Sequence, residues 1–403
     1  MGVKRILSYF ALRYLRFFAK VQLSKIKLIQ LIKGKKLIIV GITGSAGKTS
    51  CLLACQSALG SKFKLKINSS GNSETGIPLS ILDLSLANYS PLSWLKIFFL
   101  CPIKLIFDWK TYQIYLVEMG IDSQHSPKNM DYLLSIIKPD IGIFLNVSSV
   151  HQQNFNSLDQ IAFEKAKMIN LSPVGIVNLN DPLVKKYSHP KILINISKTK
   201  IDIPKFALPH AYQNTLNAAI DLSKLIGLTE SEAITNLQKN LHLPESRSSL
   251  FRGIKESTII DSSYNSSPLA CQEMLKLLEN YPQFRIAVLG DLRELGTATS
   301  HDHHQIYQTA LKSSDMIISV GPETQKYFGP KAHKFLYWWQ AANYLQKNIP
   351  DKATILVKGS QNSIFLEELV KSLLQDSSDV NKICRQTPYW LRLKEKFKKN
   401  ATV

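Results

Sequence analysis

A run of small, polar and basic residues has the composition of a phosphate-binding loop. It lies between an apolar stretch at residues 37–40 and a helix-forming stretch at residues 50–59. In this arrangement glycines let backbone N–H groups surround a phosphate, a lysine neutralises the β- and γ-phosphates, and a hydroxyl ligates magnesium. We therefore predict that the loop binds ATP. The predicted nucleotide-binding residues of the loop are Gly44, Ser45, Ala46, Gly47, Lys48, Thr49 and Ser50.

The usual eight-residue form of this loop begins with glycine, whereas Ile42 stands at that position here. The alternative interpretation is a glycine-rich turn that binds nothing. The strand expected before the loop and the helix expected after it favour phosphate binding.

The short loop Thr-Gly-x-x-Gly-Lys-Thr resembles that of the Mur ligases and of their folylpolyglutamate synthase relatives. Further segments resemble motifs of the same family in the same order. They are residues 71–78, 118–120, 146–151, 161–165, 261–268, 290–296 with His304, and 358–360. The segment 71–78 is similar to the branch of the family that adds D-alanyl-D-alanine. The resemblance covers about residues 37–370.

This resemblance implies an ATP-dependent ligase. Such enzymes transfer the γ-phosphoryl group to a carboxylate, and an amine then attacks the acyl phosphate, so cations must be fixed where anions meet. Thr49 and Glu118 would hold one magnesium ion. His151 and a carbamylated Lys165 would hold a second, because carbamylation turns an ammonium group into an anionic one. The resemblance implies the catalytic residues Lys48, His151, Lys165 and Asp261.

Each of these residues also has a plainer interpretation. Lys167 shares the expected helix with Lys165, although the motif spacing at residues 161–165 selects Lys165. A solvated helix lysine would explain either one. His151 could be a buried, hydrogen-bonded imidazole, and Glu118 could be a helix cap or an ion-pair partner.

The resemblance assigns further nucleotide contacts after residue 210. Asn214 would lie near adenine and Arg247 near the phosphates, while Asp261 would face the nucleotide and the incoming amine at a domain closure, together with Tyr264 and Asn265. A turn anchor is the alternative for Asp261. The sequence departs from the family pattern at Gln213, where histidine is usual, at Ser262, where a second aspartate is usual, and at Gln361, where arginine is common.

The elements that must position these residues alternate between strands and helices. Strands are expected at residues 37–40, 112–117, 141–145, 175–178, 258–260, 285–289, 316–320 and 354–357, and a helix at 211–226. The pattern predicts an α/β protein: a P-loop central domain with a mostly parallel sheet, followed by a smaller Rossmann-like α/β domain. The expected boundaries are 1–36 for a basic amphipathic helix, 37–243 for the central domain, 244–375 for the second domain and 376–403 for a basic tail.

The net charge of +20 is concentrated at the two ends of the 403-residue chain. Residues 1–73 contain fourteen Lys or Arg and no acid, and residues 381–403 contain seven Lys or Arg and one acid. No zinc pattern or RNA-binding aromatic signature accompanies this charge, so a nucleic-acid partner is not expected. Basic ends fit an anionic membrane surface or anionic substrates.

Residues 4–33 have the composition of a basic amphipathic helix. Two interpretations stay open: interfacial binding to the inner face of the cell membrane, and docking on the protein's own body. The aromatic insertion at residues 84–111 could cover a substrate, contact a membrane or pack as a hairpin.

Family members that add D-alanyl-D-alanine usually carry an N-terminal domain that grips uridine, and about 36 residues precede the first expected strand here. The resemblance therefore gives no expectation of how this chain recognises uridine. Our hypothesis is that the first helix and the insertion replace that domain and that the acceptor is a large anionic peptidoglycan precursor, with lipid-linked forms among the candidates.

The five cysteines show no metal-ligand spacing, which indicates a reducing cytoplasm, and neither a signal peptide nor a membrane span is expected. We expect a monomeric ligase that joins a muramyl-peptide carboxylate to an amine, D-Ala-D-Ala, with ATP and two Mg²⁺. The alternatives are a folylpolyglutamate or γ-glutamyl ligase and a non-catalytic nucleotide-binding protein at a membrane surface. Retention of Lys48, Thr49, Glu118, His151 and Lys165 argues against the last of these.

Overall fold

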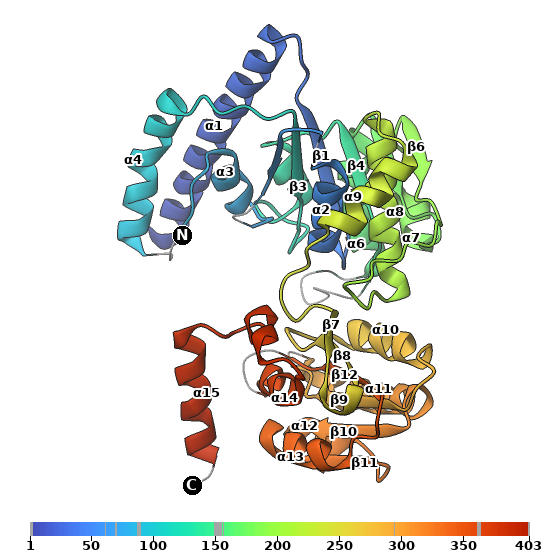
Figure 1. Cartoon of the computed structure of the whole chain (residues 1–403). Helices are drawn as coiled ribbons and strands as arrows, with labels where there is room; N and C mark the ends of the chain where they lie inside the picture. Colours follow the sequence, from blue (N-terminus) through green and yellow to red (C-terminus); the bar gives the residue numbers. More distant parts are fainter. Residues whose placement is uncertain are drawn as a thin grey trace. The chain divides into compact units, whose positions relative to one another are not determined.

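The computed structural model describes residues 3–60, 62–68, 71–86, 90–148, 155, 157–293, 295–360 and 364–401. His151 and Gln361 lie outside the described residues. The chain divides into two compact units (Figure 1). The first unit comprises residues 1–201 and 212–242, and the second comprises residues 202–211 and 243–403.

The first unit is built on a six-stranded parallel sheet in the order β2-β3-β1-β4-β5-β6. Its strands are β1 (Ile38–Thr43), β2 (Leu65–Ile67), β3 (Ile114–Glu118), β4 (Ile141–Phe144), β5 (Val174–Val177) and β6 (Ile192–Asn195). The central strands consist mainly of Ile, Val and Leu because both of their faces are covered by helices. The strand order reverses at β1, so the carboxyl ends of β1, β3 and β4 frame the crevice where open α/β sheets bind ligands.

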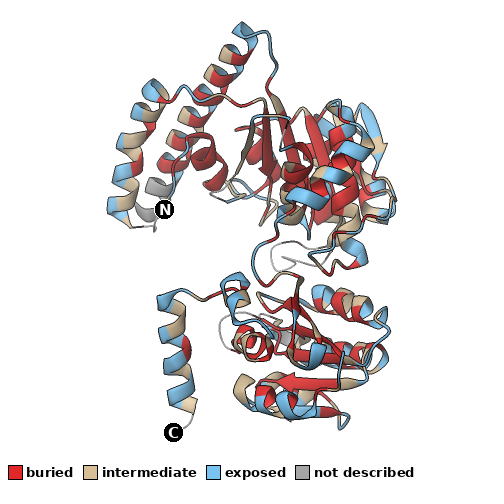
Figure 2. Cartoon of the chain, in the orientation of Figure 1, coloured by how far each residue is buried: buried red, intermediate tan, exposed pale blue. Residues whose placement is uncertain are grey.

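Helices cover both faces of this sheet, and their buried sides form the core (Figure 2). They are α2 (Lys48–Leu59), α3 (Gly76–Ile81), α5 (Met130–Leu134), α6 (Leu158–Leu171), α7 (Pro182–Tyr187), α8 (His210–Leu225) and α9 (Glu230–Asn240). Side-chain caps fix several of their starts. The Ser157 hydroxyl accepts from the Gln160 amide at the start of α6, and Asp181 accepts from Leu183 and Val184 at the start of α7.

A pair of helices, α1 (Val3–Ile32) and α4 (Pro91–Phe107), packs side by side in the first unit (Figure 1). Residues 91–107 of the insertion form a helix and not a hairpin. Leu23 and Ile26 of α1 are buried in the main core of this unit, and Leu15 is buried against Ile97 of α4. Docking of the first helix on the protein's own body is thus observed.

The second unit contains a six-stranded sheet in the order β11-β10-β9-β12-β8-β7, in which β7 is antiparallel to its neighbour. Its strands are β7 (Ser249–Arg252), β8 (Thr258–Ser262), β9 (Arg285–Gly290), β10 (Met316–Val320), β11 (Ala332–Phe335) and β12 (Thr354–Lys358). Its helices are η2 (Ile254–Glu256), α10 (Pro268–Glu279), η3 (Gly296–Ala298), α11 (Thr299–Ser313), α12 (Pro322–Tyr327), α13 (Trp338–Asn348), α14 (Leu366–Leu373), η4 (Ser377–Lys382) and α15 (Pro388–Ala401).

The predicted α/β class with a mostly parallel sheet is confirmed. Four strands were not predicted, namely β2, β6, β7 and β11. Each has three or four residues and lies at or near a sheet edge, where the run of buried apolar residues is short. Among the described residues, no helix combines the length and the apolar composition needed to cross a bilayer.

Candidate functional site

The phosphate loop connects β1 to α2 at the carboxyl edge of the first sheet. Gly47 caps α2 with a φ of 80°, a left-handed conformation that favours glycine. A Cβ atom at this position would lie 3.3 Å from Thr215 Cγ2 of α8, so space is limited as well. Lys48 then begins the helix, and the loop amides therefore lie where a helix N-terminus attracts phosphate.

Asn146, which follows β4, fixes this loop from the neighbouring strand. Its side-chain oxygen accepts from the Ala46 amide at 2.9 Å, and its backbone oxygen accepts from the Ser45 amide at 3.0 Å. The Asn146 side-chain nitrogen donates to the Ala46 carbonyl at 3.1 Å. Asn146 belongs to a recognised segment, but the sequence alone assigned it no role.

Two lysines converge on one carbonyl of the loop. Lys48 Nζ donates to the Gly44 oxygen at 2.9 Å, and Lys165 Nζ of α6 donates to the same oxygen at 3.2 Å. Lys165 is only 3% exposed. Burial lowers the pKa of Lys48, and burial together with the charge of Lys48 lowers the pKa of Lys165 to about 7. A substantial fraction of Lys165 is therefore a neutral amine near neutral pH.

Lys167 lies in a different environment from Lys165. Its Nζ pairs with Asp131 and Glu164 at 2.6 Å each, and these partners raise the pKa of Lys167. A lysine held protonated by two carboxylates is a poor nucleophile. Of the two candidate lysines, the structure brings Lys165 to the phosphate loop.

Glu118 ends β3 opposite the loop and is almost fully buried. One carboxylate oxygen accepts from the Thr49 hydroxyl at 2.8 Å, and the other accepts from the Asn72 amide at 2.7 Å. Asn68 accepts from the Glu118 backbone amide at 2.9 Å and donates to its carbonyl at 3.1 Å. A Cβ atom on Gly120 would lie 2.9 Å from Asn72, which explains the glycine after Glu118.

The oxygen donors at this site fit magnesium. A hydroxyl and a carboxylate are hard ligands, and Mg²⁺ in nucleotide sites takes few protein ligands and completes its shell with phosphates and water. Within the described part of the chain, no cluster of three His, Cys, Asp or Glu side chains offers a complete protein cage. His151, which we predict as a ligand of the second magnesium ion, lies outside the described residues.

The first turn of α8 lies beside the loop and contains Asn214. The neighbouring Tyr212 hydroxyl contacts the Ser50 hydroxyl at 2.7 Å, and Thr215 packs near Gly47 as described above. Asn214 is half-buried at this end of the helix. Gln213, at the usual histidine position, instead bonds to both the amide and the carbonyl of Ile201.

Sequence reasoning missed several residues of this site. Asn68 and Tyr212 lie outside the recognised motifs, so no signal marked them. Asp122 lies four residues after Glu118, and its negative charge favours the charged forms of both Lys48 and Lys165. A carboxylate four residues beyond a predicted metal ligand could have been noted as a candidate.

In the second unit, Asp261 and Ser262 end β8 and Lys358 ends the adjacent β12. Asp261 is fully buried, and its Oδ1 accepts from the Ser263 amide at 3.0 Å. Burial raises the pKa of Asp261. These contacts support the turn-anchor interpretation of Asp261.

Lys358 contacts Ser262, which stands where the family pattern has a second aspartate. Lys358 Nζ donates to the Ser262 hydroxyl at 3.2 Å and to the Asn265 carbonyl at 3.1 Å. Burial lowers the pKa of Lys358 to about 8, with the charge of Arg247 acting in the same direction and that of Asp261 against it.

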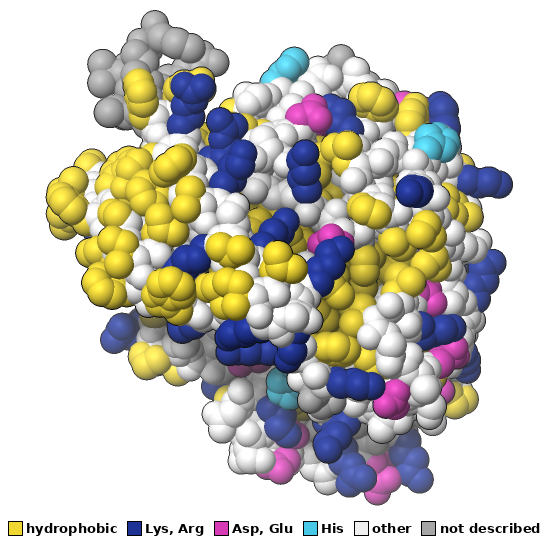
Figure 3. All heavy atoms as spheres, turned by 90° about the horizontal axis from the view of Figure 1, so that it is seen from above, with side chains coloured by type: hydrophobic (Ala, Val, Ile, Leu, Met, Phe, Trp, Pro, Cys, Tyr) yellow, Lys and Arg dark blue, Asp and Glu magenta, His cyan; other side chains and the backbone are white. Residues whose placement is uncertain are grey.

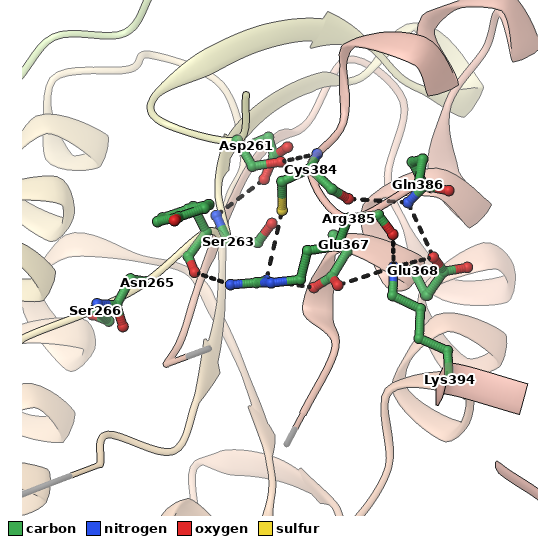
Figure 4. Close-up of polar contacts among 12 residues, drawn as sticks. Asp261, Ser263, Asn265, Ser266, Glu367, Glu368, Cys384, Arg385, Gln386 and Lys394 are labelled. Carbon is green, nitrogen blue, oxygen red and sulfur yellow. Dashed lines mark hydrogen bonds and ion pairs between the residues drawn. The ribbon is translucent and has the colours of Figure 1, made fainter. Parts of the chain in front are cut away.

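Two arginines contact the ring of Tyr264. The guanidinium carbon of Arg247 lies 4.6 Å from the Tyr264 ring centroid, and that of Arg385 lies 5.0 Å from it. The exposed Asn265 follows, with its side-chain oxygen accepting from the Ser266 amide at 2.9 Å (Figure 4). Arg385 was assigned only to the basic tail from the sequence.

The histidine named with the segment 290–296 is not the one that contacts it. His304 is exposed and bonds to the Ser300 carbonyl, whereas His303 is buried and lies 3.1 Å from the Leu292 amide, from which it accepts. Both histidines lie in the second turn of α11, so a shift of one position moves the imidazole from solvent into the core.

The sequence of the chain matches two domain families and several ligases of known name. Residues 42–207 match the Mur ligase middle domain, and residues 246–361 match the Mur ligase, glutamate ligase domain. The UDP-N-acetylmuramoyl-tripeptide–D-alanyl-D-alanine ligase of Buchnera aphidicola subsp. Acyrthosiphon pisum is 27% identical over 396 aligned residues, covering 86% of this chain and 78% of that protein. The ligase of the same name from Escherichia coli (strain K12) is 24% identical over 382 aligned residues, covering 84% and 77%.

Solved structures share the fold. MurF ligase from Thermotoga maritima in complex with ADP aligns with a TM-score of 0.68 and 19% identity, covering 95% of this chain and 84% of that one. An FPGS–AMPPCP–folate complex aligns with a TM-score of 0.55 and 14% identity, covering 90% and 94%.

Proposed function

The chain belongs to the Mur ligase family, and we propose that it is an ATP-dependent ligase that joins D-Ala-D-Ala to a UDP-N-acetylmuramoyl-tripeptide in peptidoglycan synthesis. The observation that carries the proposal is the convergence of Lys48 and Lys165 on the Gly44 carbonyl, beside the Thr49–Glu118 pair. The names of the sequence relatives supply the substrates.

In this proposal the first unit activates the acceptor carboxylate. The loop amides and Lys48 bind the β- and γ-phosphates of ATP, and Lys48 stabilises charge as the γ-phosphoryl group moves to the carboxylate. Thr49 and Glu118 would hold one Mg²⁺, and His151 with carbamylated Lys165 would hold a second. Magnesium there would neutralise phosphate oxygens during transfer.

The remaining assignments concern the nucleotide and the incoming amine. Asn214 is proposed to contact adenine, and Arg247, Tyr264 and Asn265 to contact the nucleotide. The Arg247–Tyr264 stacking at 4.6 Å supports a pre-organised guanidinium in this group. Asp261 is proposed as a catalytic residue that faces the nucleotide and the incoming amine, whereas its bond to the Ser263 amide fits the alternative role of a turn anchor.

We further propose that the enzyme is a cytoplasmic monomer with peripheral attachment to the inner face of the cell membrane. The five cysteines of the chain are free thiols in the structure, which fits a reducing compartment. Residues 1–36 are the proposed contact with anionic lipid.

Release of phosphate from ATP tests the proposed function. We expect release only when a UDP-muramoyl-tripeptide and D-Ala-D-Ala are both present. Release that instead requires a folate and glutamate would establish the γ-glutamyl ligase alternative. Nucleotide binding without release for either substrate pair would identify a non-catalytic binding protein and overturn the proposal.

A further inference from the structure

An exposed apolar stripe runs along α1. Phe10, Phe17, Val21, Leu28 and Ile32 are all solvent-exposed. Their spacings of seven, four, seven and four residues confine them to an arc of about 60°, given about 100° per helical residue. They therefore form one line of side chains on the outer side of a helix whose inner side is buried in the core.

A second exposed stripe runs along α4. Its members are Leu92, Leu95, Phe99, Ile103, Ile106 and Phe107. Aromatic contacts link the two helices: the Phe17 and Phe18 ring centroids lie 5.3 Å apart, those of Phe18 and Tyr14 lie 4.6 Å apart, and those of Tyr14 and Phe98 lie 4.8 Å apart. We call the two stripes and these rings the helix-pair surface.

Figure 3 shows hydrophobic side chains gathered on the side of the molecule where Figure 1 draws α1 and α4, with Lys and Arg side chains beside them. Contiguous exposed apolar side chains on a folded protein mark interaction sites more often than scattered ones do. The helix-pair surface therefore needs an occupant.

The charges around the helix-pair surface are cationic. Arg13, Lys20 and Lys27 are exposed at seven-residue intervals along one flank of the α1 stripe. No acid occurs in residues 1–73, and the acid within residues 84–111, Asp108, is buried. An anionic occupant is thus favoured. A second copy of the same surface would bring like charges together and is disfavoured.

We propose that the helix-pair surface binds the anionic headgroup layer of a lipid bilayer, with α1 and α4 lying in the plane of the interface. Exposed Phe and Leu on one side of a helix with Lys and Arg beside them are the features of an interfacial helix. Each cation near an anionic bilayer strengthens binding about fivefold. The ligase would thereby work at the membrane surface.

Flotation of the full chain with lipid vesicles tests this proposal. We expect the protein to float with vesicles of phosphatidylcholine containing phosphatidylglycerol, and much less with phosphatidylcholine alone. The double variant Phe17→Ser/Phe99→Ser removes two side chains that are 60% and 66% exposed, so the fold should be kept while flotation is lost. The triple variant Arg13→Gln/Lys20→Gln/Lys27→Gln should weaken binding to anionic vesicles about 100-fold.

A matched control distinguishes binding by the helix-pair surface from non-specific binding of exposed apolar residues to vesicles. Leu269→Ser/Tyr389→Ser replaces exposed apolar residues of the second unit and should float like the native chain. Deleting α1 is not a useful test, because its buried residues belong to the core. Equal flotation of the native chain and the Phe17/Phe99 variant would overturn the proposal. A native dimer in sedimentation that the same variant converts to a monomer, with no flotation, would assign the surface to a second copy instead.

A separate observation concerns the C-terminal tail. Glu367 of α14 is fully buried and pairs with Arg385 at 3.3 Å and with Lys394 of α15 at 3.0 Å (Figure 4). Lys394 also donates to the Arg385 carbonyl at 2.9 Å and contacts Glu368 at 2.7 Å. The tail is thus locked to the domain by a buried ionic network.

This network places Arg385 against Tyr264. Its Nη2 donates to the Tyr264 carbonyl at 2.5 Å, and its guanidinium lies over the ring that Arg247 contacts from another position. The amide of Cys384, the residue before Arg385, donates to the hydroxyl of Ser246, the residue before Arg247, at 3.0 Å. Arg385 therefore fixes the backbone and the ring of a residue assigned to the nucleotide.

We infer that Arg385 is a positioning residue for nucleotide binding, an inference that rests on the proposed function of Arg247 and Tyr264. Arg385→Ala should raise the KM for ATP about tenfold with little change in kcat, since it removes the charged hydrogen bond to the Tyr264 carbonyl. It also removes the pair with Glu367, so thermal stability should fall, although Lys394 still pairs with that carboxylate. Arg385→Lys, which can keep the pair with Glu367, should recover part of the loss. Arg392→Ala, on the exposed side of α15, should behave like the native enzyme.

Three results distinguish the possible failures. A native enzyme that releases no phosphate for any substrate pair refutes the proposed function and leaves the direct affinity for ADP as the readout for Arg385. Native kinetics and native ADP affinity in Arg385→Ala refute the positioning role. A fall in kcat and thermal stability at unchanged KM would identify a purely structural residue, which also refutes it.

Discussion

Lys165→Ala is expected to lower the kcat of phosphate release at least about 1,000-fold, the scale of losing a fixed charge-stabilising group in an active site. The reason is the position of Lys165 Nζ, 3.2 Å from the Gly44 carbonyl that also binds Lys48. As a carbamate, this side chain would supply the anionic oxygens of the proposed second magnesium site. Alanine removes a buried amine that forms no ion pair with a carboxylate of the described residues, so folding should be preserved, which thermal unfolding can check.

Chemical rescue distinguishes a carbamate from an ammonium at this position. Formate or acetate should restore part of the activity of Lys165→Ala, because a small carboxylate can occupy the space left by the side chain. Lys167→Ala is the matched control and should keep native kcat, since Lys167 pairs with Asp131 and Glu164. Native activity in Lys165→Ala would exclude the assignment.

The pKa of Lys165 adds a pH test of the same role. Burial and the neighbouring Lys48 lower this pKa to about 7, so the amine is mainly protonated below pH 7 and mainly neutral above it. Only the neutral amine reacts with CO₂. The carbamate signal in ¹³C NMR with labelled CO₂ should therefore grow as the pH rises through about 7. A signal of the same size in Lys165→Ala would mean that it arises elsewhere.

Glu118→Gln is expected to lower kcat about 100-fold to 1,000-fold and to raise the Mg²⁺ concentration needed for half-maximal activity. The carboxylate binds the Thr49 hydroxyl and the Asn72 amide at 2.8 and 2.7 Å. Glutamine has the same shape, and Asn72 can turn its amide to present an oxygen, so both contacts can be kept while the charge is lost. A loss of one charged group at a magnesium site is worth several kcal/mol.

Two measurements check that Glu118→Gln keeps the native fold and the nucleotide site. Thermal unfolding of Glu118→Gln should match that of the native protein, and the affinity for ADP without Mg²⁺ should be unchanged. An unchanged Mg²⁺ requirement with full activity would show that Glu118 serves only as the hydrogen-bond partner of Thr49 and Asn72.

The parts of the molecule that the sequence could predict depend on local patterns. The loop at residues 43–49 is contiguous, and its glycines, lysine and flanking strand and helix carry the signal without knowledge of the tertiary fold. The preference for Lys165 over Lys167 likewise came from spacing, and the two lysines occupy different environments in the structure.

The parts that escaped prediction depend on long-range contacts or on mixed signals. Ser90 and Pro91 form a helix start that was present in the sequence, but Pro102 inside the segment obscured the helix α4 that follows. Strands β6 and β11 have four residues each at or beside a sheet edge, too short for a periodicity. The ion pair of Arg385 with Glu367 could not be predicted, because Glu367 lies on a separate helix, α14.

Arg385 and Lys394 lie beyond residue 361, where the match to the glutamate ligase domain ends, yet they are the partners of a carboxylate with no access to solvent. A version of the protein that ends at residue 375, the domain boundary predicted from the sequence, would keep Glu367 and remove both partners, which leaves this carboxylate ionised in an apolar interior at a penalty of about 3–5 kcal/mol. The extent of a cooperative folding unit is thus set by where its last buried charge is neutralised, and expression boundaries for this protein should be drawn after Lys394.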